Sequence, residues 1–383
     1  MFDNNLNLVK SIFLATIIAL LFMGITFFIS SSKNSIEENS TSMGVFEGAE
    51  EIKKIKSTQS LDEQVMWYTR LIERVGPENA QEFLYYSGLP FDGQSHLLNH
   101  TSGESIYEKF GTRGLIYCKD YFLSSCYHGF LIRAIGEGGM NEVEKSMEEC
   151  SNAGWNVFAQ CSHAVGHGFL AYVGYANLLE ALALCDSFES RVQGFPVFNC
   201  HDGVFMENIW AAHEGGEKPP DRWVKESEYD YPCSDPRIEK RYLEACWSNQ
   251  PALMYEFFEG DVARVGEGCE TVKDTGLREM CFNGLARQIH PVAMGDIEKV
   301  FGMCGILAES WRDYCLLIIA SSDFGVGGRD ISFEICNRMN AQNRGEDCYE
   351  QLLSSIKVHA VSKKERTQLC EKIENVEWRD KCF

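Results

Sequence analysis

Residues 304–315, CGILAESWRDYC, begin and end with cysteine and carry a Trp-Arg-Asp run just before the second cysteine. Two other stretches repeat this arrangement, CETVKDTGLREMC at 269–281 and CEKIENVEWRDKC at 370–382. In each, an aromatic residue or Leu is followed by Arg, an acid, one further residue and Cys. We interpret the second cysteine as lying on the first helix of a helical hairpin, and the first cysteine as ending the helix before it. The pattern therefore predicts a repeated two-helix unit.

The cysteines recur along the chain with a nearly constant period. One series, mostly 33 to 35 residues apart, is Cys126, Cys161, Cys246, Cys281, Cys315, Cys348 and Cys382. A second series with nearly the same period is Cys150, Cys185, Cys233, Cys269, Cys304, Cys336 and Cys370. The one long interval, from Cys161 to Cys246, contains Cys200 and an acidic loop insert at 217–232. A period near 34 residues is typical of one helix–turn–helix unit of a solenoid.

From residue 61 onward, apolar residues recur at spacings of three and four, as in LDEQVMWYTRLIERV (61–75) and across 347–373. This spacing favours helices, and no stretch alternates as a strand does. The sequence therefore predicts an all-α solenoid of repeats of about 34 residues, stapled by disulfides. By period and helix pattern, residues 118–383 resemble the Sel1-like and tetratricopeptide class of helical-repeat proteins. The resemblance implies the fold and no functional residue, because the tetratricopeptide pattern W-x2-L-G-x2-Y is absent.

The sixteen cysteines are an even number and predict disulfides formed in an oxidising compartment. One pairing scheme joins the two ends of each hairpin, such as Cys281 with Cys304, but leaves Cys118 and Cys382 at opposite ends of the stack. We prefer the scheme that joins neighbours along the chain, although both suit antiparallel helices. Its pairs are Cys118–Cys126, Cys150–Cys161, Cys185–Cys200, Cys233–Cys246, Cys269–Cys281, Cys304–Cys315, Cys336–Cys348 and Cys370–Cys382.

Residues 11–30, SIFLATIIALLFMGITFFIS, carry no charge and match the hydrocarbon core of a bilayer when helical. A cleaved signal peptide is the alternative, but the apolar run is long and the following SSKNS is a weak cleavage site. We expect an uncleaved transmembrane signal anchor, with residues 1–10 in the cytoplasm and the body in a periplasmic, extracellular or lumenal space. Residues 31–60, rich in Ser, Glu and Lys, are expected to form a flexible tether.

The 383 residues are 45% apolar, as in globular proteins, and carry 56 acids against 35 bases. The net charge of −21 repels phosphate backbones, so we expect no nucleic-acid partner. We divide the body into a histidine-bearing repeat region at 61–216, the insert at 217–232, and repeats without the histidine pattern at 233–383.

The histidine pattern occurs twice, in units 96–139 and 163–216. A pair of histidines four residues apart begins each unit, and the first precedes a cysteine by 22 residues in both. A second cysteine follows with a histidine and a glycine, in CYHG (126–129) and CHDG (200–203), although the two histidines differ in offset by one residue. In a later repeat, CFNG (281–284) has Asn283 in the place of the histidine of CYHG.

Histidines four apart on a helix lie on one face, so both imidazoles can bind one ion. A histidine from the next hairpin, His128 or His201, would complete a three-histidine set with an open position. Glu104 and Glu207 are candidates for further ligands or for carboxylates that orient an imidazole. We predict a divalent transition metal, Zn, Cu or Fe, at one site or two, bound by His96, His100, His128, His163, His167 and His201. The alternative is a structural hydrogen-bond network.

We therefore expect a membrane-anchored, extracytoplasmic binding protein with a histidine-rich metal site and a protein partner on its helical-repeat surface. A metal-dependent oxidoreductase or hydrolase that uses the same histidines is one alternative. A purely structural interaction scaffold is another. A zinc protease of the H-E-x-x-H type is excluded, because Leu97 and Ala164 stand where the catalytic Glu is required.

Overall fold

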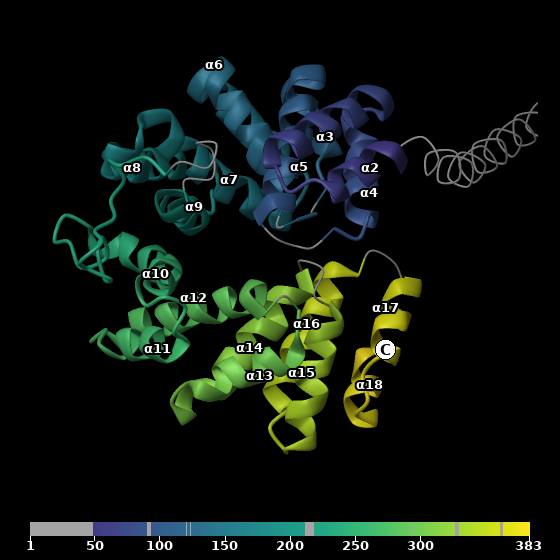
Figure 1. Cartoon of the computed structure of the whole chain (residues 1–383), viewed down its shortest axis with the longest axis vertical. Coiled ribbons are helices and arrows are strands. Elements are labelled where there is room, and N and C mark those ends of the chain that lie inside the picture. Colours follow the sequence, from purple (N-terminus) through teal and green to yellow (C-terminus); the bar gives the residue numbers. More distant parts are fainter. Residues whose placement is uncertain are drawn as a thin grey trace, which may run out of the picture. The chain divides into compact units, whose positions relative to one another are not determined.

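The computed structural model describes residues 49–89, 93–119, 121–122, 124–210, 218–293, 295–325, 329–360 and 363–383. Across these residues the regular secondary structure is helical and contains no strand (Figure 1), which confirms the all-α prediction. The predicted signal anchor at 11–30 lies outside the described residues. Among the helices that are described, none is both long and apolar enough to span a bilayer.

The chain divides into two compact units, Met1–Gly76 and Pro77–Phe383. In the described part of the first unit, α2 (Ala49–Ser57) packs on α3 (Leu61–Val75). Helix α3 has the bounds of the apolar window noted at 61–75, and its N-cap Ser60 accepts a hydrogen bond from the Glu63 amide.

Helix α2 lies inside the segment that the sequence predicted as a tether. Its Ile52 and Ile55 stand three residues apart on one face, and Ile55 is fully buried. Acids in the first turn and lysines in the last turn suit the helix dipole. Residues 49–57 therefore form a packed helix, whereas residues 31–48 lie outside the described part of the chain.

The second unit is built from helices in two alternating sets. Each of α5, α6, α7, α9, α10, α12, α14 and α16 packs on the next member of this series, and α8, α11, α13 and α15 pack beside them. The bounds are α4 (Pro77–Tyr86), α5 (Gly93–Phe110), η1 (Gly111–Tyr117), α6 (Ser125–Asn152), α7 (Trp155–Val173), η2 (Tyr175–Asn177), α8 (Leu178–Glu189), α9 (Val197–Trp210), η3 (Lys240–Tyr242), α10 (Leu243–Phe257), α11 (Val262–Glu270), α12 (Thr275–Ala293), α13 (Ile297–Ile306), α14 (Glu309–Gly325), α15 (Arg329–Ala341), α16 (Glu346–His359), α17 (Lys363–Glu371) and α18 (Val376–Cys382).

All sixteen cysteines form disulfides, and every bridge joins neighbours along the chain, as the preferred scheme predicts. The sequence separations run from 8 to 15 residues. The Cα–Cα distances, from 5.3 to 6.4 Å, are those of ordinary disulfides. Such short cross-linked loops typically stabilise a fold by about 2–4 kcal/mol each. The bridges therefore fix α6, α7, α9, α10, α12, α14, α16 and α18 each to the segment that precedes it in the chain.

The repeated aromatic residue of the sequence motif joins successive repeats. The ring of Trp311 stacks on Phe282 with centroids 4.0 Å apart, and Trp378 stacks on Tyr349 at 5.7 Å. Phe282 and Tyr349 each directly follow the second cysteine of the preceding repeat. The motif is therefore a packing signal that places one hairpin on the next.

The repeated arginine of the motif satisfies a backbone carbonyl at the end of the preceding helix. Arg312 donates from Nε to the Leu307 carbonyl at 2.9 Å, and Arg278 donates from Nε to the Val272 carbonyl at the same distance. Leu307 and Val272 lie just after α13 and α11, which end at Ile306 and Glu270, so each arginine bonds the backbone where the helix has ended.

Candidate metal centre

Helices α5 and α6, which carry His96, His100 and His128, approach so closely that only glycine fits at their contact. A β-carbon at Gly129 in α6 would lie 2.0 Å from the carbonyl oxygen of His100 in α5. The same relation holds between α9 and α7, where a β-carbon at Gly203 would lie 2.0 Å from the carbonyl oxygen of His163. This direct backbone contact allows histidine side chains from neighbouring helices to meet.

These glycine contacts also define the register of the duplication. Gly284 stands in the same relation to Ser248 as Gly129 does to His100, so α10 and α12 form a third pair of this kind. When the two units are aligned, His100 rather than His96 is therefore equivalent to His163. Counting back from Cys118 and Cys185 aligned His96 with His163 instead. That count fails because the segments leading to the two cysteines differ, with η1 before the first and α8 before the second.

Five of the six predicted ligands form one cluster across three successive helices. His96 and His100 come from α5, His128 from α6, and His163 and His167 from α7. They make two triplets, His96–His100–His128 and His128–His163–His167. Within each triplet, one nitrogen from every ring lies within 4.8 Å of the others. His128, on the middle helix, belongs to both.

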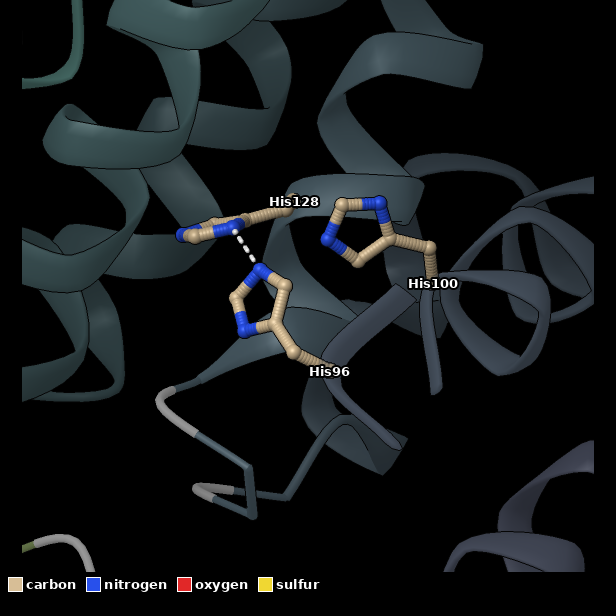
Figure 2. Close-up of side chains that lie close together, drawn as sticks. All are labelled: His96, His100 and His128. Carbon is tan, nitrogen blue, oxygen red and sulfur yellow. Dashed lines mark hydrogen bonds between the residues drawn. The ribbon is translucent and has the colours of Figure 1, made fainter. Parts of the chain in front are cut away.

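In the first triplet, the three rings face one another from two helices (Figure 2). His96 Nδ1 lies 2.8 Å from the carbonyl oxygen of Phe122. A carbonyl only accepts, so this nitrogen carries the ring proton of His96 and leaves a lone pair on Nε2. That Nε2 lies 3.2 Å from Nδ1 of His128. The backbone thus orients His96 so that its Nε2 is directed into the cluster.

In the second triplet, two carboxylates orient the rings. His163 Nδ1 lies 3.1 Å from Asp202 Oδ2, and His167 Nδ1 lies 2.8 Å from Glu207 Oε2. A carboxylate accepts, so both Nδ1 atoms carry protons and both Nε2 atoms present lone pairs. These two Nε2 atoms are 3.0 Å apart. Carboxylates on the far side of metal-bound imidazoles hold ligand rings in this way.

The two carboxylates are themselves held in place. Burial raises the pKa of Asp202, but the charge of Arg287 and the hydrogen bonds from His163 and Asn249 outweigh it and lower that pKa below its usual range. Asn249 Nδ2 donates to Asp202 Oδ1 at 2.7 Å. Asp202 is therefore ionised at neutral pH and accepts the proton of His163.

Glu207 is fully buried between two polar partners. One oxygen contacts His167, and the other accepts a hydrogen bond from the hydroxyl of Tyr175. A buried carboxylate is stable only when its oxygens are satisfied, so Tyr175 supports the orientation that Glu207 imposes on His167.

The central histidine is held neutral. Burial lowers the pKa of His128 well below its usual value, and the neighbouring imidazoles of His167, His96, His163 and His100 lower it further. A neutral imidazole offers a lone pair, which is the form that binds metals. The central ring of the cluster is therefore in the form that can bind a metal.

Known proteins offer no match for this chain. No family model matches it. Neither a curated protein nor a solved structure matches it. The chemistry of the histidines is therefore inferred from their geometry.

The predicted ligand His201 lies outside both triplets. Its Nε2 lies 2.9 Å from Asp186 Oδ1, and its ring packs edge-on against Tyr242. One residue turns a helix by about 100°, so His201 points away from the face that its neighbour Asp202 shares with the cluster. By the glycine register, Asp202 precedes Gly203 as His128 precedes Gly129. The one-residue offset between CYHG and CHDG was the signal of this difference.

The two candidate glutamates are placed differently. Glu207 contacts His167, as a carboxylate that orients an imidazole should. Glu104 is exposed and lines a surface pocket with Ile132, Arg133, Gly136 and Glu137. Asp202 and Tyr175 were not predicted as site residues, because their roles depend on contacts between helices.

Proposed function

We propose that this chain binds a divalent transition metal, Zn, Cu or Fe, at its five-histidine cluster. The observation that carries the proposal is the 3.0 Å separation between His163 Nε2 and His167 Nε2, with both Nδ1 atoms donating to carboxylates. Two lone pairs facing each other at this distance repel unless a cation lies between them. Two nitrogens about 3 Å apart can both bind one ion at about 2.0–2.1 Å.

A structural hydrogen-bond network explains this geometry less well. Each ring proton of His163 and His167 already points to Asp202 or Glu207, so a hydrogen bond between the two Nε2 atoms requires an additional proton. That proton would place an imidazolium beside His128, which burial and its neighbours keep neutral. A metal ion occupies the same position without protonating a ring, and imidazole ligands suit Zn, Cu and Fe.

The proposed setting of the site is a disulfide-stapled α-solenoid on the outside of a membrane. The 34-residue cysteine period and the series of helices that each pack on the next support the solenoid. The sixteen paired cysteines are typical of an oxidising compartment. The apolar run at 11–30 would anchor the chain, and the repeat surface would bind a protein partner.

The test is metal retention by the untagged, oxidised full-length chain, purified in mild detergent. Zn(II), Cu(II) and Fe(II) are added in separate samples, unbound metal is removed by gel filtration, and metal is measured by elemental analysis. We expect stoichiometric metal in the wild type and less metal per chain in the double variant His163→Asn/His167→Asn. The matched control is His201→Asn, which removes a buried histidine outside the cluster and should keep the metal.

Wild-type protein that retains none of the three metals would refute the proposal. Equal loss of metal in His201→Asn and in the double variant would also count against it, because the cluster would then not be the binding site. Near-ultraviolet circular dichroism of each variant establishes that the fold is intact before metal is measured.

A further inference from the structure

His128 is the only member of the cluster that belongs to both triplets. It lies on α6, and α6 packs against α5 on one side of the cluster and against α7 on the other. The remaining four histidines divide by helix, with one pair on α5 and one pair on α7. The arrangement is thus two pairs of imidazoles with one imidazole between them.

One ion cannot easily bind all five rings in this arrangement. Two nitrogens on opposite sides of an ion are at most about 4.2 Å apart when each bond is about 2.1 Å. The nitrogens of each triplet lie within 4.8 Å of one another, close to this distance, whereas the α5 pair and the α7 pair belong to separate groups. Each triplet therefore has the dimensions of a site for its own ion.

The two ring nitrogens of His128 point in different directions, one toward His96 and the other away from the α5 pair. Its Nδ1 faces Nε2 of His96 at 3.2 Å, and the second ring nitrogen points away from both His96 and His100 (Figure 2). That Nε2 is buried and has no hydrogen-bond partner among the described residues. The rings of His167 and His163 have centroids 4.8 and 5.4 Å from the His128 ring. A buried polar atom without a partner costs about 1–3 kcal/mol, and a metal ion would satisfy it.

We infer that the cluster is a binuclear centre in which His128 bridges two metal ions, one bound with His96 and His100 and the other with His163 and His167. This inference rests on the proposed function and adds the number of ions and the shared ligand. When both ring nitrogens bind metal, the one ring proton of His128 is released to solvent. Two nearby dications favour that loss. Asp202 and Glu207 place negative charge beside the second ion, through His163 and His167.

The experiment is a Cu(II) titration of the untagged full-length chain, with metal content and electron paramagnetic resonance measured on the same samples. We expect two copper ions per chain and a resonance signal smaller than that of two isolated ions, because the shared imidazole couples their spins. The double variants His96→Asn/His100→Asn and His163→Asn/His167→Asn should each keep one copper with the full signal of an isolated ion. His128→Asn should weaken both sites.

Each outcome has one meaning. A single copper that both double variants lose would overturn the binuclear inference and leave metal binding intact. Two coppers with independent signals, retained in His128→Asn, would overturn the bridging role. No bound copper, together with no bound Zn or Fe, would refute the proposed function itself. If a double variant does not fold, the copper content and spin coupling of the wild type still decide between one ion, two separate ions and a bridged pair.

Discussion

The backbone of Gly203 lies so close to His163 that a β-carbon would stand 2.0 Å from the carbonyl oxygen of that histidine. This contact joins α9 to α7. Asp202, the residue directly before Gly203, contacts His163 Nδ1. The distance between the His163 ring and the carboxylate that orients it is therefore set by a glycine. Backbone contact, rather than side-chain packing, determines the geometry of this half of the cluster.

Gly203→Ala should destabilise the protein and weaken metal binding together. The added methyl group would force α9 away from α7, and such overpacking typically costs about 1–3 kcal/mol. The displacement would also lengthen the contact between Asp202 and His163. Urea unfolding and a metal competition assay with a chromophoric chelator measure the two effects.

The matched control is Gly302→Ala in α13, where no atom lies within 4 Å of the added β-carbon. It should keep metal affinity unchanged and raise the free energy of unfolding by about 0.5–1 kcal/mol, as alanine does in a helix. A Gly203→Ala protein with wild-type stability and affinity would show that α7 and α9 can separate without consequence.

Glu207→Gln should lower metal affinity by about 10- to 100-fold, as loss of a carboxylate behind a metal-bound histidine does. The amide remains able to accept from Tyr175, so the fold should be retained, but the negative charge that orients His167 is lost. Asp186→Asn is the control, since Asp186 makes the same kind of contact with His201 outside the cluster. Equal affinities for the two variants in a chelator competition would contradict the role given to Glu207.

The sequence predicted the repeat and the disulfide pairing because both depend on residues close together in the chain. Cysteines 8 to 15 residues apart can only join adjacent helices, and the Trp-Arg-acid-x-Cys motif acts within one repeat and its neighbour. Helix α2 was missed because its nine residues are highly charged and only Ile52 and Ile55 indicate a buried face.

The candidate site was predictable in part. Spacing of four residues identified the pairs on α5 and α7, because residues on one helix face need no tertiary information. The partners of those pairs required the register between helices. His201 and Asp202 are adjacent in sequence, yet only Asp202 faces His163. A single residue decides which side chain reaches the cluster. Counting two residues on from Cys126 and Cys200 gives His128 and Asp202, and the glycine contacts show that this is the structural register.

Removal of the disulfide between α6 and α7 should affect metal binding as well as stability. Cys161 lies two residues before His163, and its bridge to Cys150 ties α7 to the end of α6, the helix of His128. We expect Cys150→Ser/Cys161→Ser to lose about 2–4 kcal/mol of stability and to bind metal more weakly. Urea unfolding and chelator competition measure these changes.

The control pair is Cys370→Ser/Cys382→Ser, whose bridge spans a loop of nearly the same length, 12 residues against 11, on α17 and α18. This variant should lose similar stability and keep its metal affinity. Similar metal loss in both variants would mean that general destabilisation, and not the fixed position of α7, explains the effect.

His201 should make the stability of the metal-free protein depend on pH without contributing to metal binding. Burial lowers its pKa in the folded state, although the hydrogen bond and charge of Asp186 partly oppose this. In the unfolded chain the imidazole of His201 therefore takes up a proton near pH 6.5, whereas in the folded chain it stays neutral at that pH. The stabilisation that follows is fully present above pH 6.5 and is lost as pH falls below it, by up to about 1.4 kcal/mol per pH unit.

His201→Asn removes this titration and should give a shallower fall in the free energy of unfolding between pH 7.5 and 5.5 than the wild type shows. Urea unfolding in the presence of a chelator measures both slopes. His128 also has a lowered pKa, but it is present in both proteins and cancels in the comparison. Parallel pH profiles would show that His201 titrates alike in the folded and unfolded chains. Retention of full metal content by the same variant would confirm that His201 stabilises the fold beside the cluster and is not one of its ligands.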